Sequence, residues 1–484
     1  MRKELIGMML ACALNACAPL TTPMPQTVAS SPPAEPTSPN KVAAPADTPA
    51  PEPEPSINGT WIGASGASDF MLAGGGDTFL GVWVDVPSVT RKVRSPMSIA
   101  LVMDTSGSMA GPKMEHARVA ARSLVQSLPD GDIVSLHTFS DEASERVPPT
   151  ALDASTRSRI LGTIAEFEPR GGTNIFDGLR IGASRVIHAP STHAVRRVVM
   201  ISDGIATVGP SSPEVLGQLA ARGADQGVQV TAIGVGLEYD EKTLNALAIR
   251  SSGRLYHLAE PKEMTAILDR EMKLLQGTMA TGAFVEVVPA PGVQLLGADG
   301  VRADWNGTGL RVPLGSMFGG QHREILVRVR VTETGTGVRP LASVRLHFRD
   351  PAEGNLERVQ EVVARFESTT DPLVVERRAS VKTRQIMAMN EAAQASSRAA
   401  EQVNAGQFEA ADKDLAIAEK KLQESAKQAT NSKEKVRIEA QAASVSAARK
   451  SASAAAAAPP AARPAKQRAS SLEINDRAMD AAGY

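Results

Sequence analysis

The fold is decided by the stretch Ile99-Ala-Leu-Val-Met-Asp104-Thr-Ser106-Gly-Ser108-Met109. An apolar run leads directly into one carboxylate and two hydroxyls at alternate positions. Residues 116–128 then carry apolar side chains at helical spacing, which predicts a helix with one buried face. Continuous apolar runs are typical of parallel strands that are covered on both faces. The sequence therefore predicts an α/β fold built on a doubly wound, mostly parallel sheet.

Two further oxygen-bearing side chains follow apolar runs or glycines downstream. Thr173 lies in Gly171-Gly172-Thr173-Asn174, and Asp203 follows the run at 198–202. Ligands of such sheets lie beyond the carboxyl ends of the strands, so we expect these side chains to converge there. The expected metal ligands are Asp104, Ser106, Ser108, Thr173 and Asp203. Oxygen ligands without Cys or His suit Mg²⁺, Mn²⁺ or Ca²⁺ and argue against Zn²⁺.

The pattern resembles a von Willebrand factor A domain that carries a complete metal-ion-dependent adhesion site. Asp-x-Ser-x-Ser alone recurs by chance, but here a strand, a helix and both distant ligands accompany it. The resemblance runs from about Met97 to about Leu268 and includes the strand-like segment 132–139. Residues 230–236 and 247–253 are similar to a bacterial subgroup related to calcium-activated chloride channel homologues and inter-α-trypsin inhibitor heavy chains.

The resemblance also implies a role for each ligand. Ser106 and Ser108 would bind the cation through their hydroxyls, and Thr173 would bind it directly in one state and through water in another. Asp104 and Asp203 would hold coordinated waters. Neutral ligands leave the cation poorly neutralised, so it would accept an Asp or Glu of a partner protein.

Length and composition limit the remaining possibilities. A chain of 484 residues is too long for one ordinary domain. Its 52 basic and 53 acidic residues are balanced and form no basic stripe with aromatics, so nucleic-acid binding has no support.

The N-terminus is typical of a targeting segment. Arg2 and Lys3 precede an apolar stretch too short to span a bilayer, and Leu14-Asn15-Ala16-Cys17 resembles a bacterial lipobox. Residues 1–17 are therefore expected to be a lipoprotein signal peptide, after which Cys17 would carry acyl chains that anchor the protein. This predicts a lipid-anchored protein of the bacterial cell envelope, on the outer membrane if the organism is Gram-negative, because no Asp follows Cys17. An ordinary secretory signal is the alternative.

Composition shifts divide the rest of the chain before the helices. Residues 18–78 are rich in Pro, Ala, Ser and Gly, and we expect a disordered tether. Strand-like runs at 79–96 and 280–370 alternate apolar with charged residues, which predicts an antiparallel β-sandwich with one wet face. The von Willebrand factor A domain, residues 97–279, would then be an insertion in that sandwich. Two consecutive domains without a shared strand are the alternative.

The C-terminal part has a helix-forming composition over residues 371–458. Around Gly406 it resembles a tetratricopeptide-type hairpin, with Phe408, Ala411, Leu415, Ala418 and Leu422 on one side of the second helix. A plain helical stalk is equally compatible with this pattern. We expect residues 459–484 to be a disordered tail.

These patterns favour a membrane-anchored, metal-dependent module that binds proteins in adhesion or assembly. The alternative is a cell-envelope scaffold whose metal site is mainly structural. An enzyme is not expected, because the chain has no Gly-x-Ser-x-Gly elbow and no His in a motif that would activate a nucleophile. His137 lies in a strand-like run and is expected to be packed. After the signal segment no apolar run is long enough for a membrane helix, which argues against a channel.

Overall fold

The computed structural model describes residues 59–88, 94–236, 239–332 and 337–481. All of them belong to one compact unit, which spans Glu52–Tyr484. The predicted signal peptide, Cys17 and the tether up to residue 58 lie outside the described residues. Within the described ranges, no helix has the length and apolar character that crossing a membrane requires.

The α/β domain has a six-stranded sheet in the order β6-β5-β4-β7-β8-β9. Its strands pair in parallel except β6, an antiparallel edge strand. The strands are β4 (Met97–Asp104), β5 (Ile133–Phe139), β6 (Ala143–Ala151), β7 (Val195–Ser202), β8 (Val228–Val235) and β9 (Arg254–Leu258). Both β4 and β8 are buried along their whole length, as their apolar runs predict. The expected doubly wound, mostly parallel sheet is confirmed.

Helices cover both faces of this sheet. One core joins β4 and β7 to α1 (Pro112–Ser127), α2 (Ala154–Ala165) and α6 (Met264–Gln276), and the other core joins the opposite face to α3 (Ile175–Ile187), α4 (Pro213–Ala224) and α5 (Glu241–Arg250). Short 3₁₀ turns, η1 (Gly107–Met109) and η2 (Pro261–Glu263), precede α1 and α6. Apolar residues at helical spacing on each helix account for this packing.

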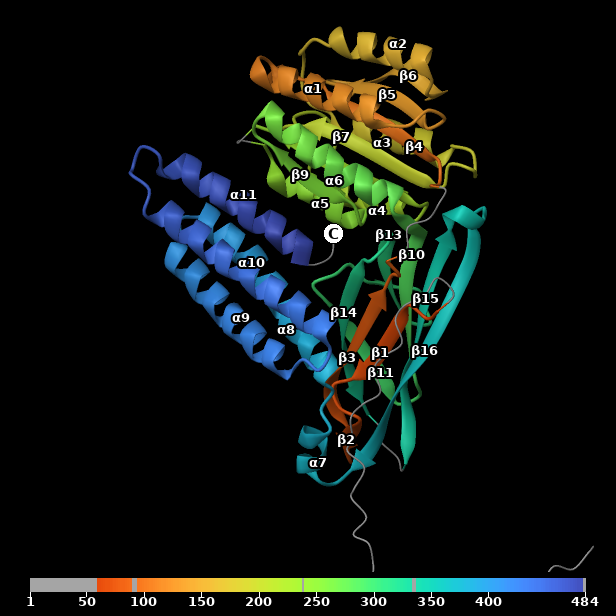
Figure 1. Ribbon diagram of the computed structural model, residues 1–484, viewed down its shortest axis with the longest axis vertical. Coiled ribbons are helices and arrows are strands. Elements are labelled where there is room, and N and C mark those ends of the chain that lie inside the picture. Colours follow the sequence, from red (N-terminus) through yellow and green to blue (C-terminus); the bar gives the residue numbers. More distant parts are fainter. Residues whose placement is uncertain (1–58, 89–93, 237–238, 333–336, 482–484) are drawn as a thin grey trace, which may run out of the picture. The chain divides into compact units, whose positions relative to one another are not determined.

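Two further sheets form a β-sandwich around a second core. One sheet has the order β1-β3-β14-β11 and the other β12-β13-β10-β15-β16-β2 (Figure 1). The strands are β1 (Ile62–Gly66), β2 (Phe70–Leu72), β3 (Gly76–Asp85), β10 (Thr278–Pro289), β11 (Val293–Asp299), β12 (Asp304–Trp305), β13 (Leu310–Phe318), β14 (His322–Val331), β15 (Val338–Asp350) and β16 (Leu356–Thr369), with a 3₁₀ turn, η3 (Pro351–Glu353), before β16. β3 pairs with β14 along its whole length, so the α/β domain is inserted between strands of one sandwich.

The two junctions of this insertion are held by one turn. The turn between β13 and β14 donates a hydrogen bond from Gly319 N–H to the Gly277 carbonyl at the exit of the α/β domain (2.9 Å). The next residue donates from Gly320 N–H to the Val86 carbonyl at the entry (3.1 Å). The chain therefore leaves and re-enters the sandwich at neighbouring points.

The prediction that residues 18–78 form a disordered tether is wrong for residues 59–78. β1, β2 and the start of β3 lie there, and Trp61 stacks on Phe348 with ring centroids 4.6 Å apart. The small side chains allow close packing: a Cβ at Gly63 would lie 2.3 Å from the Trp83 ring. Gly63 therefore leaves room for the ring, whereas Ser65 contacts the hydroxyls of Ser380 and Thr383.

The C-terminal region is a bundle of four long helices, α8 (Val381–Asn404), α9 (Phe408–Gln428), α10 (Ser432–Ala456) and α11 (Arg463–Ala481), preceded by the short α7 (Pro372–Arg377). The expected apolar side of α9 is buried, with Leu415 and Leu422 at 0% exposure. The predicted disordered tail at 459–484 is wrong, because α11 occupies most of it. Leu472, Ile474 and Met479 are buried, so tertiary packing compensates for the polar composition of α11.

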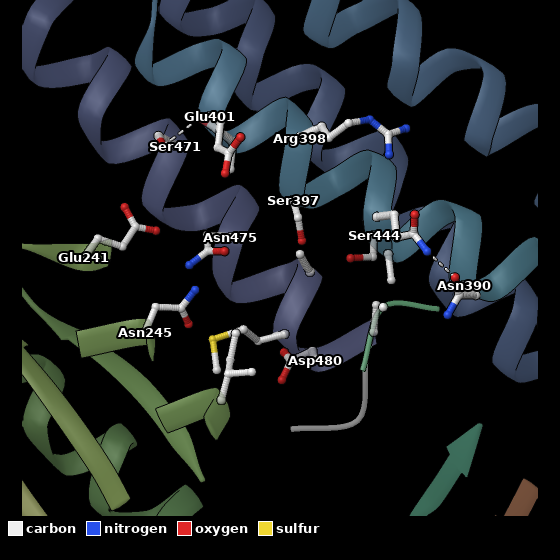
Figure 2. Close-up of a pocket in the computed structure, with 18 of the residues that line it drawn as sticks. Glu241, Asn245, Asn390, Ser397, Arg398, Glu401, Ser444, Ser471, Asn475 and Asp480 are labelled. Atoms are coloured by element: carbon white, nitrogen blue, oxygen red, sulfur yellow. Dashed lines mark hydrogen bonds between the residues drawn. The ribbon is translucent and has the colours of Figure 1, made fainter. Parts of the chain in front are cut away.

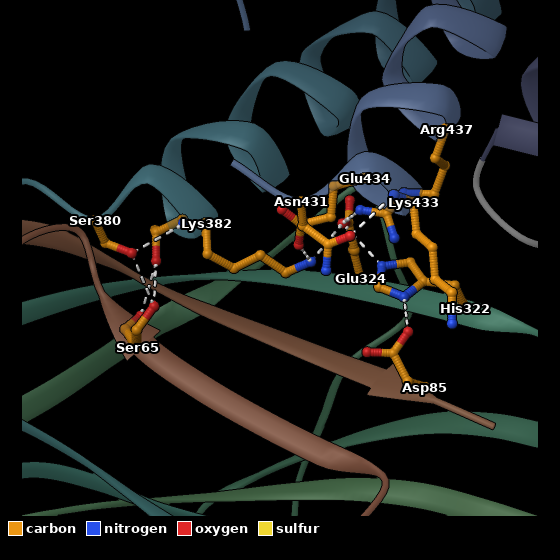
Figure 3. Close-up of polar contacts among 11 residues, drawn as sticks. Ser65, Asp85, His322, Glu324, Ser380, Lys382, Asn431, Lys433, Glu434 and Arg437 are labelled. Carbon is orange, nitrogen blue, oxygen red and sulfur yellow. Dashed lines mark hydrogen bonds and ion pairs between the residues drawn. The ribbon is translucent and has the colours of Figure 1, made fainter. Parts of the chain in front are cut away.

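A polar network joins the bundle to the sandwich (Figure 3). Glu324 on β14 accepts hydrogen bonds from Arg437 on α10 and from Nε2 of His322, the latter at 2.9 Å. His322 also contacts Asp85 through Nδ1, and Lys382 on α8 pairs with Glu434. Burial alone would raise the pKa of Glu324, but His322 and Arg437 hold that pKa below its ordinary value. The network therefore places opposite charges together in a largely buried contact.

α11 joins the bundle to the α/β domain. Arg468 donates to the Glu241 carboxylate and to the Tyr239 carbonyl, both at 2.9 Å, at the start of α5. Leu472 and Met479 belong to the same buried cluster as Leu244. Asp480 accepts hydrogen bonds from Arg254 and Arg270.

Candidate metal centre

The candidate ligands all lie at the carboxyl edge of the α/β sheet. Asp104 is the last residue of β4, and Asp203 directly follows β7, the neighbouring parallel strand. Thr173 lies just before α3, whose N-cap is Asn174. Parallel strands end at the same edge, which explains why residues far apart in sequence arrive together.

Main-chain hydrogen bonds fasten the loops to each other. Gly107 N–H donates to the Gly171 carbonyl (3.0 Å), and Arg170 N–H donates to the Thr105 carbonyl (2.7 Å). These bonds tie the loop of Ser106 and Ser108 to the loop of Thr173. Gly171 has φ +72, and a Cβ there would lie 2.2 Å from Asp141 Oδ2, so this turn requires glycine.

The loop after β7 is fastened to Thr173 in turn. Thr173 N–H donates to Thr207 Oγ1 (2.9 Å), and its carbonyl accepts from Thr207 N–H (3.0 Å) and Val208 N–H (3.2 Å). The backbone of Thr173 is therefore tied to the loop after β7, while Arg170 and Gly171 of its own loop are tied to the loop of Ser106 and Ser108.

Asp104 is fully buried and engaged through both oxygens. Oδ1 accepts from Ser106 N–H (2.8 Å), and Oδ2 accepts from the Ser202 hydroxyl (2.5 Å). Burial raises the pKa of Asp104 to about 6, against the hydrogen bonds from Ser106 and Ser202, and the charge of Asp203 adds to the rise. Asp203 raises the pKa of Asp104 because the two carboxylates lie close together. A cation between them would offset both the cost of burying these charges and their mutual repulsion.

The two serine hydroxyls face each other at the mouth of the site. Ser106 Oγ and Ser108 Oγ lie 3.0 Å apart. Ser106 is 1% exposed, whereas Ser108 is exposed, so this hydroxyl pair connects the buried carboxylates with solvent. Met109 is buried in the core beneath and fixes the turn.

Asp203 is fully buried and only half satisfied. Its Oδ2 accepts from the ammonium of Lys113 on α1 at 2.8 Å. Its Oδ1 is buried and has no hydrogen-bond partner among the described residues. A buried anionic oxygen without a partner is costly, so it marks a position where a cation or a bound water fits.

The donor set consists of two carboxylates and three hydroxyls. Among the described residues, no group of three or more His, Cys, Asp or Glu side chains could hold a metal ion. A site built from carboxylate cages or imidazoles is thus not present in those ranges. The residues at this edge fit a hard, hydrated cation such as Mg²⁺.

Two contributing residues were missed at the sequence level. Ser202 holds Asp104, and Lys113 pairs with Asp203. Lys113 had a readable signal: it is the second residue of α1, where the helix dipole disfavours a positive charge unless a carboxylate lies near. Ser202 had none beyond its place next to Asp203.

A cavity of about 1180 Å³ lies among α5, α8, α10, α11 and β14. Figure 2 shows both uncharged polar side chains around it, such as Asn245 and Ser397, and charged ones, such as Glu241, Arg398 and Asp480. Asp240, which lines the cavity just before α5, donates a hydrogen bond from its N–H to the carbonyl of Asp203 in the candidate metal centre (2.8 Å). Junctions between domains are common places for small-molecule sites.

Comparisons of sequence identify the α/β region. The sequence pattern of the von Willebrand factor type A domain matches residues 98–270. An uncharacterized protein of Synechocystis sp. is 23% identical over 300 residues, which cover 58% of this chain and 70% of that protein. Human inter-alpha-trypsin inhibitor heavy chain H3 is 26% identical over 199 residues, which cover 40% of this chain but only 22% of that protein.

Solved structures share the fold. The von Willebrand factor type A protein from Catenulispora acidiphila has a TM-score of 0.67 at 17% identity, covering 87% of this chain and 98% of its own. The ArnB paralog VWA2 from Sulfolobus acidocaldarius has a TM-score of 0.55 at 14% identity, with the same two coverages of 87% and 98%. Since the sequence match, the relatives and the topology agree, residues 98–270 of this chain form a von Willebrand factor type A domain.

Proposed function

We propose that this chain is a metal-dependent protein-binding module, used in adhesion or assembly. Asp104, Ser106, Ser108, Thr173 and Asp203 would hold Mg²⁺, or Mn²⁺ or Ca²⁺ in its place. The single observation that carries the proposal is the buried, unpartnered Oδ1 of Asp203 at the edge where the hydroxyls of Ser106 and Ser108 meet. When bound, the cation supplies an open coordination position for a carboxylate oxygen of a partner protein.

The chain's own residues prepare that position. Ser106 and Ser108 present neutral oxygens, while Ser202 and the Ser106 amide hold Asp104 in one orientation. The exposure of Ser108 leaves the site open to a protruding Asp or Glu. Residues around the edge would then supply specificity.

Catalysis is not part of the proposal. His137 is buried in β5 against Ser135, with 2.9 Å between Nε2 and Oγ, and burial lowers its pKa to about 4. Its Nε2 is thus engaged by Ser135, while its Nδ1 is buried without a hydrogen-bond partner among the described residues, so nothing shows it activating a nucleophile.

We also propose that Cys17 carries acyl chains and anchors the protein in a bacterial cell envelope, on the outer membrane if the organism is Gram-negative. The support is the sequence around Leu14–Cys17. Mass spectrometry of the N-terminal peptide from membrane fractions tests it, and a mature protein that begins elsewhere contradicts it.

The test of metal-dependent binding compares the wild type with Asp104→Ala. Calorimetry with MgCl₂ should show binding to the wild type and none to the variant, and cross-linked capture of envelope proteins should require both Mg²⁺ and Asp104. Asp269→Ala, an exposed carboxylate on α6, is the matched control and should behave as the wild type. Capture that survives chelation and Asp104→Ala alike would falsify the proposal.

A mainly structural metal is the competing function, and the raised pKa of Asp104 gives it some support, since a cation would relieve a destabilising burial. The same comparison with and without Mg²⁺ distinguishes a structural metal from one that binds a partner. A structural metal raises the melting temperature but leaves partner capture unchanged when Mg²⁺ is removed below the unfolding temperature.

A further inference from the structure

Lys113 contacts the candidate metal centre without being one of its ligands. Its ammonium lies 2.8 Å from Asp203 Oδ2, and the two side chains are 28% and 0% exposed. The pair is thus buried on the side of Asp203 and open to solvent on the side of Lys113. Asp203 keeps its other oxygen, Oδ1, unpartnered.

The surroundings fix Lys113 in this place. Its aliphatic stem passes Gly236 at the end of β8, where an added Cβ would lie 3.4 Å from Lys113 Cε. That distance is an ordinary van der Waals contact, and a larger residue is disfavoured at Gly236 by its φ of +85. Lys113 is also the second residue of α1, where the helix dipole opposes a positive charge. The fold keeps this ammonium at a helix position that is unfavourable for a positive charge. The ion pair with Asp203 compensates for that cost.

We propose that Lys113 tunes the metal centre: it weakens cation binding and strengthens the acceptance of a partner's carboxylate. This inference rests on the proposed function. The ammonium already neutralises part of the charge of Asp203, so Asp203 attracts a divalent cation less strongly. In the loaded centre the same ammonium adds one positive charge, which favours an incoming Asp or Glu.

The first experiment titrates MgCl₂ alone into the full chain by calorimetry. Lys113→Gln removes the charge and keeps a hydrogen-bond donor for Asp203, so its Mg²⁺ affinity should rise by about tenfold. Lys113→Arg keeps the charge and should bind as the wild type does. Arg122→Gln removes an exposed positive charge from the same helix and is the matched control. Unchanged or weaker Mg²⁺ binding by Lys113→Gln overturns the proposal.

The second experiment measures the acidic ligand with acetate as the probe. Acetate is titrated into the Mn²⁺-loaded proteins, and displacement of coordinated water is followed by proton relaxation. Acetate should bind Lys113→Gln several-fold more weakly than the wild type. Equal or tighter acetate binding by the variant overturns the second half of the proposal.

Folding and the proposed function are controlled separately. Lys113→Gln leaves a buried Asp203 without its counter-ion, so thermal unfolding in EDTA reports the fold of the variant. If the variant is destabilised but still folded in EDTA, its rise in melting temperature with Mg²⁺ should exceed that of the wild type, and a smaller rise contradicts the proposal. If the wild type itself takes up no metal, the proposed function fails. If wild type and Lys113→Gln bind Mg²⁺ equally while Asp104→Ala does not, only the role of Lys113 fails.

Discussion

At the scale of the residue, Asp104 shows how a buried charge costs stability. Its carboxylate is fully buried, and its two oxygens accept one hydrogen bond each, from Ser106 N–H and Ser202 Oγ–H. Burial raises its pKa from 3.8 to about 6, so the ionised form is less favourable in the folded than in the unfolded chain. The stability associated with this group is therefore present at low pH and is lost as the pH rises through the folded pKa.

Asp104→Asn should accordingly stabilise the metal-free protein at neutral pH, by about 1–2 kcal/mol, because it removes a buried charge and keeps the shape. Urea unfolding in EDTA at pH 7 measures the effect. Asp203→Asn is the comparison, since it leaves Lys113 without its partner and should bring no gain. A destabilised Asp104→Asn would show that the hydrogen bonds outweigh the burial of charge.

At the scale of the element, two glycines illustrate opposite uses of a missing side chain. Gly63 on β1 lets the Trp83 ring lie against the strand, where a Cβ would come within 2.3 Å of it. Gly162 is exposed in the middle of α2, and a Cβ there would meet nothing within 4 Å. The first glycine is required by packing, whereas the second only adds backbone freedom to the unfolded chain.

Gly63→Ala should therefore destabilise the protein by about 1–3 kcal/mol, since Trp83 must move. Gly162→Ala should stabilise it by about 0.5–1 kcal/mol. Differential scanning calorimetry of both variants provides the measurement. An unchanged melting temperature for Gly63→Ala would mean that Trp83 rearranges freely.

The elements also show what the sequence could and could not predict. The apolar run of β4, followed by an apolar stripe at helical spacing, indicated the fold class, because strands covered on both faces are rich in apolar residues. β1 was missed because its small residues are typical of linkers, and only the partner Trp83 explains them. α11 was missed because its stability comes from contacts of Leu472 and Met479 with a distant domain.

The residues of the candidate site also divide into those that the sequence could predict and those that it could not. Its five oxygen side chains could be named from local pattern and order in the chain, and metal binding by them stays a prediction. Ser202 could not be assigned, and the position of Lys113 at a helix start could not name its partner, because the partners lie 98 and 90 residues away and only the sheet brings them together. Pairing across such separations is a property of topology rather than of a local motif.

At the scale of the whole molecule, the contact between bundle and sandwich depends on charge. Asp85 and Glu324 both have pKa values below their ordinary ones: burial opposes this, and His322 lowers both. A depressed pKa means that the stabilisation is complete above the unfolded pKa and is lost as the pH falls through the folded value. Acidification should therefore loosen this contact.

Glu324→Gln removes the central carboxylate, so Arg437 loses its ion pair with Glu324 while Lys382 keeps its ion pair with Glu434. We expect a loss on the order of 3 kcal/mol at pH 7, and a weaker fall in stability between pH 7 and pH 3 than in the wild type. Thermal unfolding across this pH range measures both. Glu357→Gln, an exposed carboxylate on β16, is the control. A pH profile of Glu324→Gln that parallels the wild type would assign the acid sensitivity elsewhere.

The turn at Gly319 and Gly320 has a consequence for how this architecture can vary. The turn is hydrogen-bonded to both Val86 and Gly277, so these two residues lie near each other. A short peptide could therefore join Val86 to Gly277 and leave the sandwich strands in register. The α/β domain is then an exchangeable cassette: excising it should yield a folded remainder, and a different domain with adjacent termini could be grafted in its place. Lineages could therefore exchange the inserted domain while the scaffold that carries it stays the same.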